Sequence, residues 1–226
     1  MWRVGHRGAC GHAPENTLAS MRKALEIGVD GFEFDIQMSK DGIPVVIHDD
    51  TLERTTNGKG FVRDFTFKEL QELDAGNGEK IQSLQNVIEM VDKRCRLFIE
   101  LKAENATKPV SDLLAHSVQN LGWSYEQLLV CSFNHQQIAE IRAINPEIRT
   151  VAIFVGIPVS LAVIAQEAGA WAISTAHLHS NQALVDDAHA RGLKSFVWTA
   201  NSEAHIAAAK KLGVDGIISD FPDRIA

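Results

Sequence analysis

Short apolar runs alternate along the chain with segments whose apolar residues recur at helical spacing. Leu18, Met21 and Leu25, for example, stand three and four residues apart, as on one face of an amphipathic α-helix. The short runs predict eight buried strands, at Trp2 to Gly5, Phe32 to Ile36, Leu97 to Leu101, Leu128 to Cys131, Thr150 to Phe154, Trp171 to Ser174, Ser195 to Trp198 and Gly216 to Ile218. The pattern is therefore a strand followed by a helix, repeated along the whole chain.

This repetition predicts a closed barrel. The 226 residues divided among eight strands give about 28 residues per strand and helix, near the minimum for a (β/α)₈ barrel. Left-handed caps are expected at glycines that precede strands, namely Gly28, Gly122, Gly169, Gly192 and Gly213. We expect an α/β fold of the TIM-barrel type, as a single domain over residues 1–226, because a second domain would leave too few residues for the barrel.

One segment after the second strand departs from the alternation. Lys40-Asp41-Gly42 is a hairpin-turn signal, and Ile43 to His48 forms a further apolar run that we interpret as the returning strand. Residues 51–80 then form an excursion rich in Thr, Gly and charge. Long excursions at the C-terminal face of a barrel are usually functional, although a surface elaboration is the alternative.

Charge and cysteine content narrow the class of protein. The chain has 22 Lys and Arg against 29 Asp and Glu, a formal charge of −7, which argues against nucleic acid as a partner. Cys10, Cys95 and Cys131 have neither disulfide nor zinc-site spacing, which favours a reducing compartment. No leader-like N-terminus and no apolar run of about 18 residues is found, so we expect a cytoplasmic protein without a membrane span. A homo-oligomer is compatible with these features.

Acidic residues at strand ends are the first candidates for chemistry. Glu33 and Asp35 share one face of a strand and should point together into the barrel, and Glu100 stands at the C-terminal end of the next strand. Burying like charges is costly unless a cation neutralises them. Oxygen ligands suit Mg²⁺ or Ca²⁺, whereas zinc would need His6 or His48 as a ligand. Pairing with neighbouring Lys or Arg is the alternative to a metal.

Two histidines and two cations are predicted to lie beside these carboxylates. His6 follows the first strand and His48 ends the hairpin return, a placement that favours an acid/base pair because histidine titrates near neutral pH. Arg7 and Lys102 supply fixed positive charge, so the whole set fits a phosphate ester under attack. Spacing alone does not separate monoesters from diesters.

A series of motifs in a fixed order also resembles a known family. The motifs are His6-Arg7-Gly8, Pro14-Glu15-Asn16-Thr17, Glu33-Phe34-Asp35, Lys40-Asp41-Gly42, His48-Asp49, Arg54-Thr55-Thr56-Asn57-Gly58, Glu100-Leu101-Lys102, Ser132-Phe133, Trp198-Thr199-Ala200-Asn201 and Gly213-Val214-Asp215-Gly216. Over almost the whole chain they resemble the glycerophosphodiester phosphodiesterase family, in particular its cytosolic bacterial branch. Cys10-Gly11-His12 departs from the small residues and the aromatic that the family often has there.

The resemblance implies a TIM barrel with a family-specific insertion at residues 51–80. It also implies metal-dependent hydrolysis of glycerophosphodiesters to sn-glycerol 3-phosphate and an alcohol. The roles that it implies are metal ligands at Glu33, Asp35 and Glu100, an acid/base pair at His6 and His48, and phosphate contacts at Arg7 and Lys102.

Several points stay open at this stage. Phe133 and Trp198 are candidates to shape the pocket for the leaving alcohol, whose identity the sequence does not give. Mg²⁺ and Ca²⁺, the acid and the base, and water and the 2-hydroxyl of glycerol as nucleophile are not distinguished. The alternatives are a phosphodiesterase for lysophospholipids, a non-catalytic binding protein on the same barrel, and a Schiff-base lyase acting through a strand-end lysine.

Overall fold

The computed structural model describes residues 1–225, and eight parallel strands in it close into a barrel. The first strand pairs with both the second and the last, which completes the ring. The barrel strands are β1 (Trp2–Gly5), β2 (Gly31–Met38), β4 (Arg96–Leu101), β5 (Leu128–Ser132), β6 (Arg149–Phe154), β7 (Ala172–Ala176), β8 (Lys194–Trp198) and β9 (Gly216–Ser219). Each overlaps one of the eight predicted strands, so the predicted barrel is confirmed.

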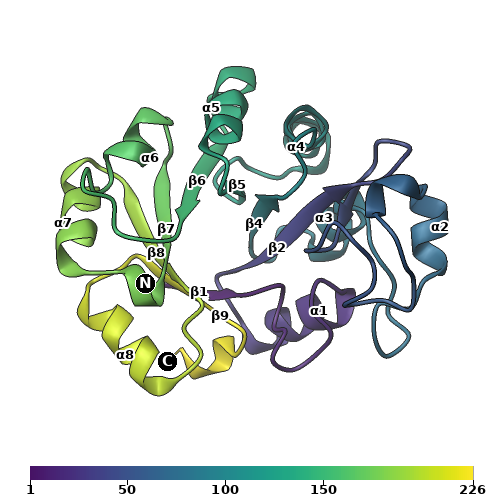
Figure 1. Ribbon diagram of the computed structural model, residues 1–226, viewed down its shortest axis with the longest axis horizontal. Coiled ribbons are helices and arrows are strands. Elements are labelled where there is room, and N and C mark those ends of the chain that lie inside the picture. The colour runs from purple at the N-terminus through teal and green to yellow at the C-terminus, as the bar shows by residue number, and fades with distance from the viewer. Residues whose placement is uncertain (226) are drawn as a thin grey trace.

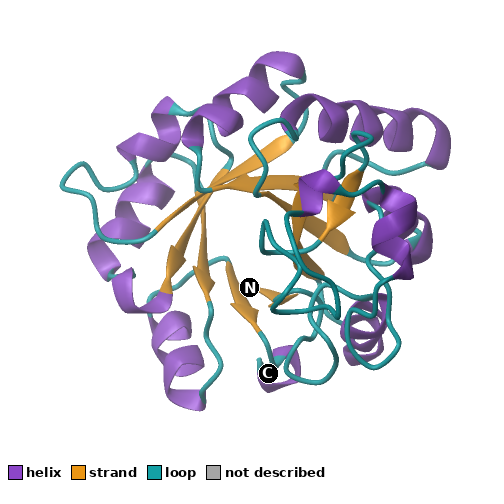
Figure 2. Ribbon diagram, turned by 45° about the vertical axis from the view of Figure 1, so that its right-hand side comes forward, coloured by secondary structure: helices purple, strands orange, loops and turns teal. Residues whose placement is uncertain are grey.

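Helices surround the strands, as the ribbon shows (Figure 1; Figure 2). They are α1 (Leu18–Ile27), α2 (Phe67–Glu72), α3 (Leu84–Val91), α4 (Thr107–Leu121), α5 (His135–Ile144), α6 (Val163–Glu167), α7 (Gln182–Ala190) and α8 (Glu203–Lys211). Short 3₁₀ turns are η1 (Val62–Asp64), η2 (His177–His179) and η3 (Pro222–Arg224). Gly28 and Gly122 cap α1 and α4 in the left-handed conformation, with φ of 75° and 73°, as the sequence predicts.

The edge of β2 that faces β1 is shared by two strands. Strand β1 pairs only with the start of β2, where Val4 lies opposite Gly31. The antiparallel strand β3 (Pro44–Val46) pairs with the end of β2, where Val46 lies opposite Ile36. Because β1 is parallel and β3 antiparallel to β2, the chain leaves the two strands in directions that approach each other along the same edge of β2. His6 follows β1 and His48 follows β3, so both histidines lie near this edge.

Between β3 and α3 the chain builds a small unit beside the barrel, at the right of Figure 1. Its helix α2 is too short for the sequence periodicity to predict, but a capping box between Thr66 and Glu69 starts it. Buried apolar side chains hold this unit together and to β3, namely Val45, Ile47, Leu52, Val62, Leu70 and Ile81. The unit is thus anchored by its own core rather than by loops alone.

Aromatic side chains fill the interior of the barrel at its N-terminal end. Trp2 stacks on Trp171 with ring centres 5.8 Å apart, and Phe196 lies 5.6 Å from Trp2 and 5.4 Å from Phe98. The guanidinium of Arg96 lies over the Trp2 ring at 4.2 Å. Because rings fill this end, the pocket inside the barrel lies toward the C-terminal ends of the strands.

This packing makes Phe196 a test of the barrel core. Phe196→Ala is expected to lower the free energy of unfolding by about 3–5 kcal/mol, because the buried ring leaves a cavity among rigid neighbours. Leu178→Ala, at a site 77% exposed on η2, should change it by less than about 0.5 kcal/mol. Urea denaturation followed by circular dichroism measures both, and equal losses in the two variants would contradict the assignment.

Candidate active site

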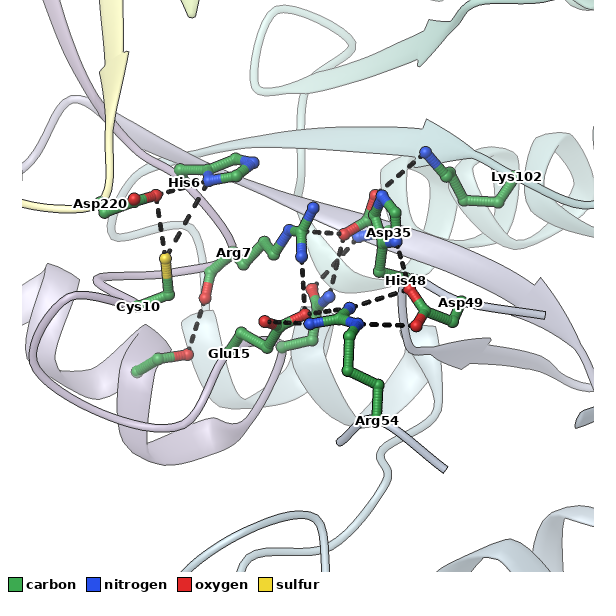
Figure 3. Close-up of polar contacts among 12 residues, drawn as sticks. His6, Arg7, Cys10, Glu15, Asp35, His48, Asp49, Arg54, Lys102 and Asp220 are labelled. Carbon is green, nitrogen blue, oxygen red and sulfur yellow. Dashed lines mark hydrogen bonds and ion pairs between the residues drawn. The ribbon is translucent and has the colours of Figure 1, made fainter. Parts of the chain in front are cut away.

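A pocket of about 190 Å³ opens at the C-terminal end of the barrel. One side is charged and polar, and is built by residues that lie in or just after β1, β2, β3 and β4. The opposite side is mainly apolar and comes from Phe98 of β4 and from β5, β6, β8 and β9, with Ser174 of β7 as a polar residue among them. The residues of the charged side are His6, Arg7, Glu33, His48, Glu100 and Lys102, most of them labelled in Figure 3.

Three buried carboxylates form the floor of the charged side. Glu33, Asp35 and Glu100 place carboxylate oxygens within 4.8 Å of one another and are at most 7% exposed. Strand alternation turns Glu33 and Asp35 inward while Phe34 between them packs in the outer core. Burial and the charges of its two neighbours raise the pKa of Glu33, and burial and Asp35 raise the pKa of Glu100 against the opposing charge of Lys102.

Two cations pair with these carboxylates but compensate only part of their charge. Lys102 Nζ lies 2.8 Å from a Glu100 oxygen and 3.8 Å from Asp35, and Arg7 Nε lies 3.4 Å from Asp35. Two positive charges stand against three acidic groups. The Oε1 atom of Glu33 is buried and has no hydrogen-bond partner among residues 1–225. The donor set therefore fits one further cation, and its oxygen atoms suit a hard divalent ion.

His6 is held by an acid from the other end of the chain. Its Nδ1 lies 2.6 Å from Asp220 Oδ1, and its Nε2 lies 3.8 Å from Glu33. Asn201 donates a hydrogen bond of 2.6 Å to the second oxygen of Asp220. Burial opposes ionisation of Asp220, but hydrogen bonds from His6, Cys10 and Asn201 outweigh it and lower its pKa to about 2. An ionised Asp220 fixes the Nδ1–H tautomer of His6.

His48 has the same arrangement with its neighbour in sequence. Its Nδ1 lies 2.6 Å from Asp49 Oδ1, and Arg54 grips both oxygens of Asp49 at 2.6 and 2.8 Å. The hydrogen bonds from Arg54 lower the pKa of Asp49 most, and the hydrogen bond from His48 lowers it further. Both imidazoles are thus oriented through Nδ1 by a carboxylate, which leaves Nε2 for a reacting group.

An ion-pair chain connects His48 to Arg7 through the insertion. Arg54 also donates two bonds of 2.8 Å to Glu15, which accepts a further bond of 2.7 Å from Arg7. Burial opposes ionisation of Glu15, but the hydrogen bonds of both arginines lower its pKa. Figure 3 shows the sequence of contacts from Asp49 to Asp35. The insertion therefore positions residues on two sides of the pocket.

Arg7 and Asn16 hold the turn above the acidic cluster in a strained conformation. Their φ angles are 48° and 58°, in the left-handed region, which costs a non-glycine residue about 1–3 kcal/mol. The Arg7 amide donates to Glu33 at 3.1 Å, and the Asn16 side chain donates to Asp35 at 2.9 Å. These bonds to the cluster compensate the strain and orient two of its three carboxylates.

Phe133 and Trp198 lie on the apolar side of the pocket. Their rings meet edge to face with centres 5.6 Å apart, and Lys102 Nζ lies 5.5 Å from the centre of the Phe133 ring. Trp198 is mostly covered, whereas Phe133 is 44% exposed at the rim. Both predicted candidates therefore face the space beside the charged groups.

The residues that orient the histidines and Arg7 were not predicted from the sequence. Glu15, Asn16, Arg54 and Asn201 stand in the motifs but bear no recognisable chemistry in isolation. Asp220 directly follows the last strand. Gly213-Val214-Asp215-Gly216 leads into that strand as Gly28-Val29-Asp30-Gly31 leads into the second strand with its two acids, and this repeat is a sequence signal that could point to Asp220. Its partnership with His6 becomes visible only when the barrel closes.

Acidic residues for a divalent cation, two oriented histidines and fixed cations at one pocket are the features of a phosphoric ester hydrolase. Residues 6–224 match the glycerophosphoryl diester phosphodiesterase family. The glycerophosphodiester phosphodiesterase of Caldanaerobacter subterraneus is 34% identical over 98% of this chain and 95% of its own length. The chain belongs to the glycerophosphoryl diester phosphodiesterase family, which confirms the resemblance and makes it an enzyme of that class.

Solved structures agree in fold. A phosphodiesterase from Oleispira antarctica, in complex with the product sn-glycerol-3-phosphate, is similar with a TM-score of 0.90 and 31% identity, over 98% of this chain and 94% of that one. A glycerophosphodiester phosphodiesterase from Agrobacterium tumefaciens gives 0.81 and 30%, over 98% and 97%. In residues 1–225, no helix combines the length and the apolar character needed to cross a bilayer.

The electrostatics of the acidic cluster give a stability prediction. Glu33→Gln should raise the free energy of unfolding of the protein in EDTA, because burial and two acidic neighbours raise the pKa of Glu33 and the neutral amide avoids the cost of ionising a carboxyl group there. Glu104→Gln, at an exposed acid, serves as the control and should have little effect. Urea denaturation at neutral pH measures both, and a destabilised Glu33 variant would show that the cluster is already fully compensated.

Proposed function

We propose that this enzyme hydrolyses glycerophosphodiesters to sn-glycerol 3-phosphate and an alcohol with the help of a divalent cation. The observation that carries the proposal is the buried, incompletely compensated acidic cluster beside two oriented histidines in one pocket. The product complex of the Oleispira antarctica relative supports the same reaction class.

Glu33, Asp35 and Glu100 would hold the cation. A cation held there would supply Lewis-acid chemistry that offsets the negative charge of a bound phosphate. The all-oxygen set suits Mg²⁺ or Ca²⁺. Arg7 and Lys102 are already held at the cluster by ion pairs, so their charges are in place to stabilise the negative charge that develops on the phosphate.

His6 and His48 move the protons. One Nε2 accepts the proton of the nucleophile, and the other donates a proton to the oxygen of the leaving alcohol. Asp220 and Asp49 stabilise the imidazolium of whichever histidine is protonated, and they keep each ring in the orientation that presents Nε2. The same pair of roles serves attack by water or by the 2-hydroxyl of glycerol.

The leaving alcohol would lie against Phe133 and Trp198. Choline over these rings would gain from cation–π attraction. Exposed apolar residues continue outward from this wall on neighbouring strand-to-helix loops, with Val155, Ile157 and Leu178 between 45% and 77% exposed. This apolar rim favours a second candidate substrate class, the lysophospholipid-type diesters.

Two further expectations complete the proposal. Residues 1–226 would act as one catalytic domain, with residues 51–80 as the insertion that carries Arg54. A cytoplasmic location is supported by Cys10, Cys95 and Cys131, all of which are free thiols.

Metal dependence is the direct test of this function. Protein stripped with EDTA should release no sn-glycerol 3-phosphate from glycerophosphocholine, and Mg²⁺ or Ca²⁺ should restore release because phosphate attack needs the missing positive charge. An enzyme-coupled assay of sn-glycerol 3-phosphate measures the product. Lysophosphatidylcholine below its micelle concentration is the parallel substrate. Full activity in EDTA would contradict the metal proposal, and turnover of the lysolipid alone would select the second substrate class.

Substitutions separate the roles of the two groups of residues. His6→Ala and His48→Ala should each lower kcat by about 10²–10⁴-fold with metal affinity nearly unchanged, because they remove proton transfer only. Glu100→Ala should weaken metal affinity. His116→Ala, on the exposed face of α4, is the matched control. Steady-state kinetics over a range of metal concentrations gives both parameters, and full rate in either of the first two variants would remove that histidine from the mechanism.

A further inference from the structure

Beside the oxygen cluster, a second group of side chains has a different donor chemistry. His6, Cys10 and Asp220 bring one nitrogen, one sulfur and one oxygen atom within 4.8 Å of one another. The Cys10 thiol lies 3.0 Å from Asp220 Oδ1 and 4.0 Å from His6 Nδ1. Figure 3 shows the three side chains converging on one point, away from Asp35 and Lys102. The two groups therefore differ in both position and ligand type.

We propose that His6, Cys10 and Asp220 form a separate site for a zinc-class divalent cation, and that its occupation inhibits the enzyme. Thiolate, imidazole and carboxylate are the three ligand types that Zn²⁺ takes in proteins, with a fourth position left for water. Mg²⁺ and Ca²⁺ prefer oxygen ligands alone, so they select the other cluster. Thiolate and carboxylate together supply two negative charges, which match one divalent ion.

The backbone places these three ligands in advance. His6 N donates to Ser219 at 2.8 Å, and Gly11 N donates to Asp220 O at 2.9 Å, so the turn after β1 is fastened to the end of β9. Asn201 binds Asp220 Oδ2 and leaves Oδ1 facing His6 and Cys10. A partner that orients a ligand from behind is typical of built metal sites.

The ligands are also accessible to an ion from solvent. His6, Cys10 and Asp220 are each partly exposed, unlike the buried carboxylates of the oxygen cluster. On binding, the Cys10 thiol loses its proton to solvent, and the ring proton of His6 moves from Nδ1 to Nε2. The hydrogen bonds that Cys10 and His6 make to Asp220 are replaced by bonds to the ion. No other group has to move between elements.

The zinc ion is expected to inhibit the enzyme because it binds to Nδ1 of His6. This expected inhibition rests on the proposed function, in which His6 transfers a proton. The ion would occupy Nδ1, the atom that Asp220 now holds, so the ring loses the carboxylate that stabilises its protonated form. With Nδ1 on the ion, Nε2 carries the one proton of the neutral ring, so it cannot accept a proton from the nucleophile and releases its own far less readily than an imidazolium does. The proton transfer assigned to His6 is therefore blocked while the oxygen cluster stays intact.

Direct binding is measured first, because it does not depend on activity. Protein saturated with Mg²⁺ is titrated with Zn²⁺ against a chromophoric chelator, and one tight site is expected. Cys10→Ser should weaken zinc affinity at least about tenfold, because the serine hydroxyl keeps its proton at neutral pH. Cys95→Ser, which removes a thiol distant from the pocket, is the matched control and should bind as the wild type does. Equal affinity in all three proteins would overturn the proposal.

A second measurement keeps the test independent of how well the variant folds. Co²⁺ added to the wild-type protein saturated with Mg²⁺ should give a thiolate-to-cobalt charge-transfer absorption that Zn²⁺ abolishes. Its absence would overturn the site without any substitution. Zinc binding that is lost in Glu100→Gln but kept in Cys10→Ser would place the ion in the oxygen cluster instead, and would likewise overturn the proposal.

Inhibition is tested by measuring the rate of diester hydrolysis at increasing zinc concentrations. Each rate is given relative to the rate of the same variant without zinc. The zinc concentration for half inhibition should rise at least about tenfold in Cys10→Ser and stay unchanged in Cys95→Ser. If zinc binds at Cys10 but the wild-type rate is unchanged, the inhibition is disproved while the site stands. If no variant hydrolyses the diesters at all, the proposed function fails, and the binding data still decide the site.

Discussion

The active-site end of this barrel is organised around three carboxylates buried in its wall. Glu33 and Asp35 must both turn inward, because strand alternation sends the phenylalanines between and beside them to the outer core. Their mutual repulsion raises the free-energy cost of burying them, and the surrounding residues compensate part of this cost. Lys102 and Arg7 bring positive charge, and the Arg7 amide and Asn16 bring hydrogen bonds. The strained turn after β1 is best understood as part of that compensation.

A second layer of ion pairs makes the arrangement rigid. Each histidine is oriented by an ionised aspartate, and each aspartate is held in turn by a further side chain, Asn201 or Arg54. Arg54 belongs to the unit between β3 and α3, which has its own apolar core. The unit thus supports the pocket through Arg54. This support explains why residues 51–80 depart from the regular alternation of strands and helices.

Much of the fold and the main candidates for chemistry could be predicted from local patterns. Strand length, helical spacing and glycine caps depend on neighbouring residues, so they indicate the barrel without knowledge of contacts. The clustering of Glu33, Asp35 and Glu100 follows from alternation and from the shared end of parallel strands. The pairing of His6 with Asp220 could not be predicted in this way, because it depends on ring closure between residues 214 positions apart. Helix α2 could not be predicted because its six residues, with Leu70 as the buried one, are too few to show a helical periodicity.

Strands β1 and β9 are the first and last of the barrel, and their pairing brings Asp220 to His6. A chain still lacking its final strand could fold much of the sheet and gather the oxygen ligands, yet its first histidine would have no fixed tautomer. If His6 transfers a proton as proposed, the chain would therefore have little activity during synthesis until the ring is complete. On the proposed function, an open barrel that keeps its helices and strands would be recognised by its lower activity.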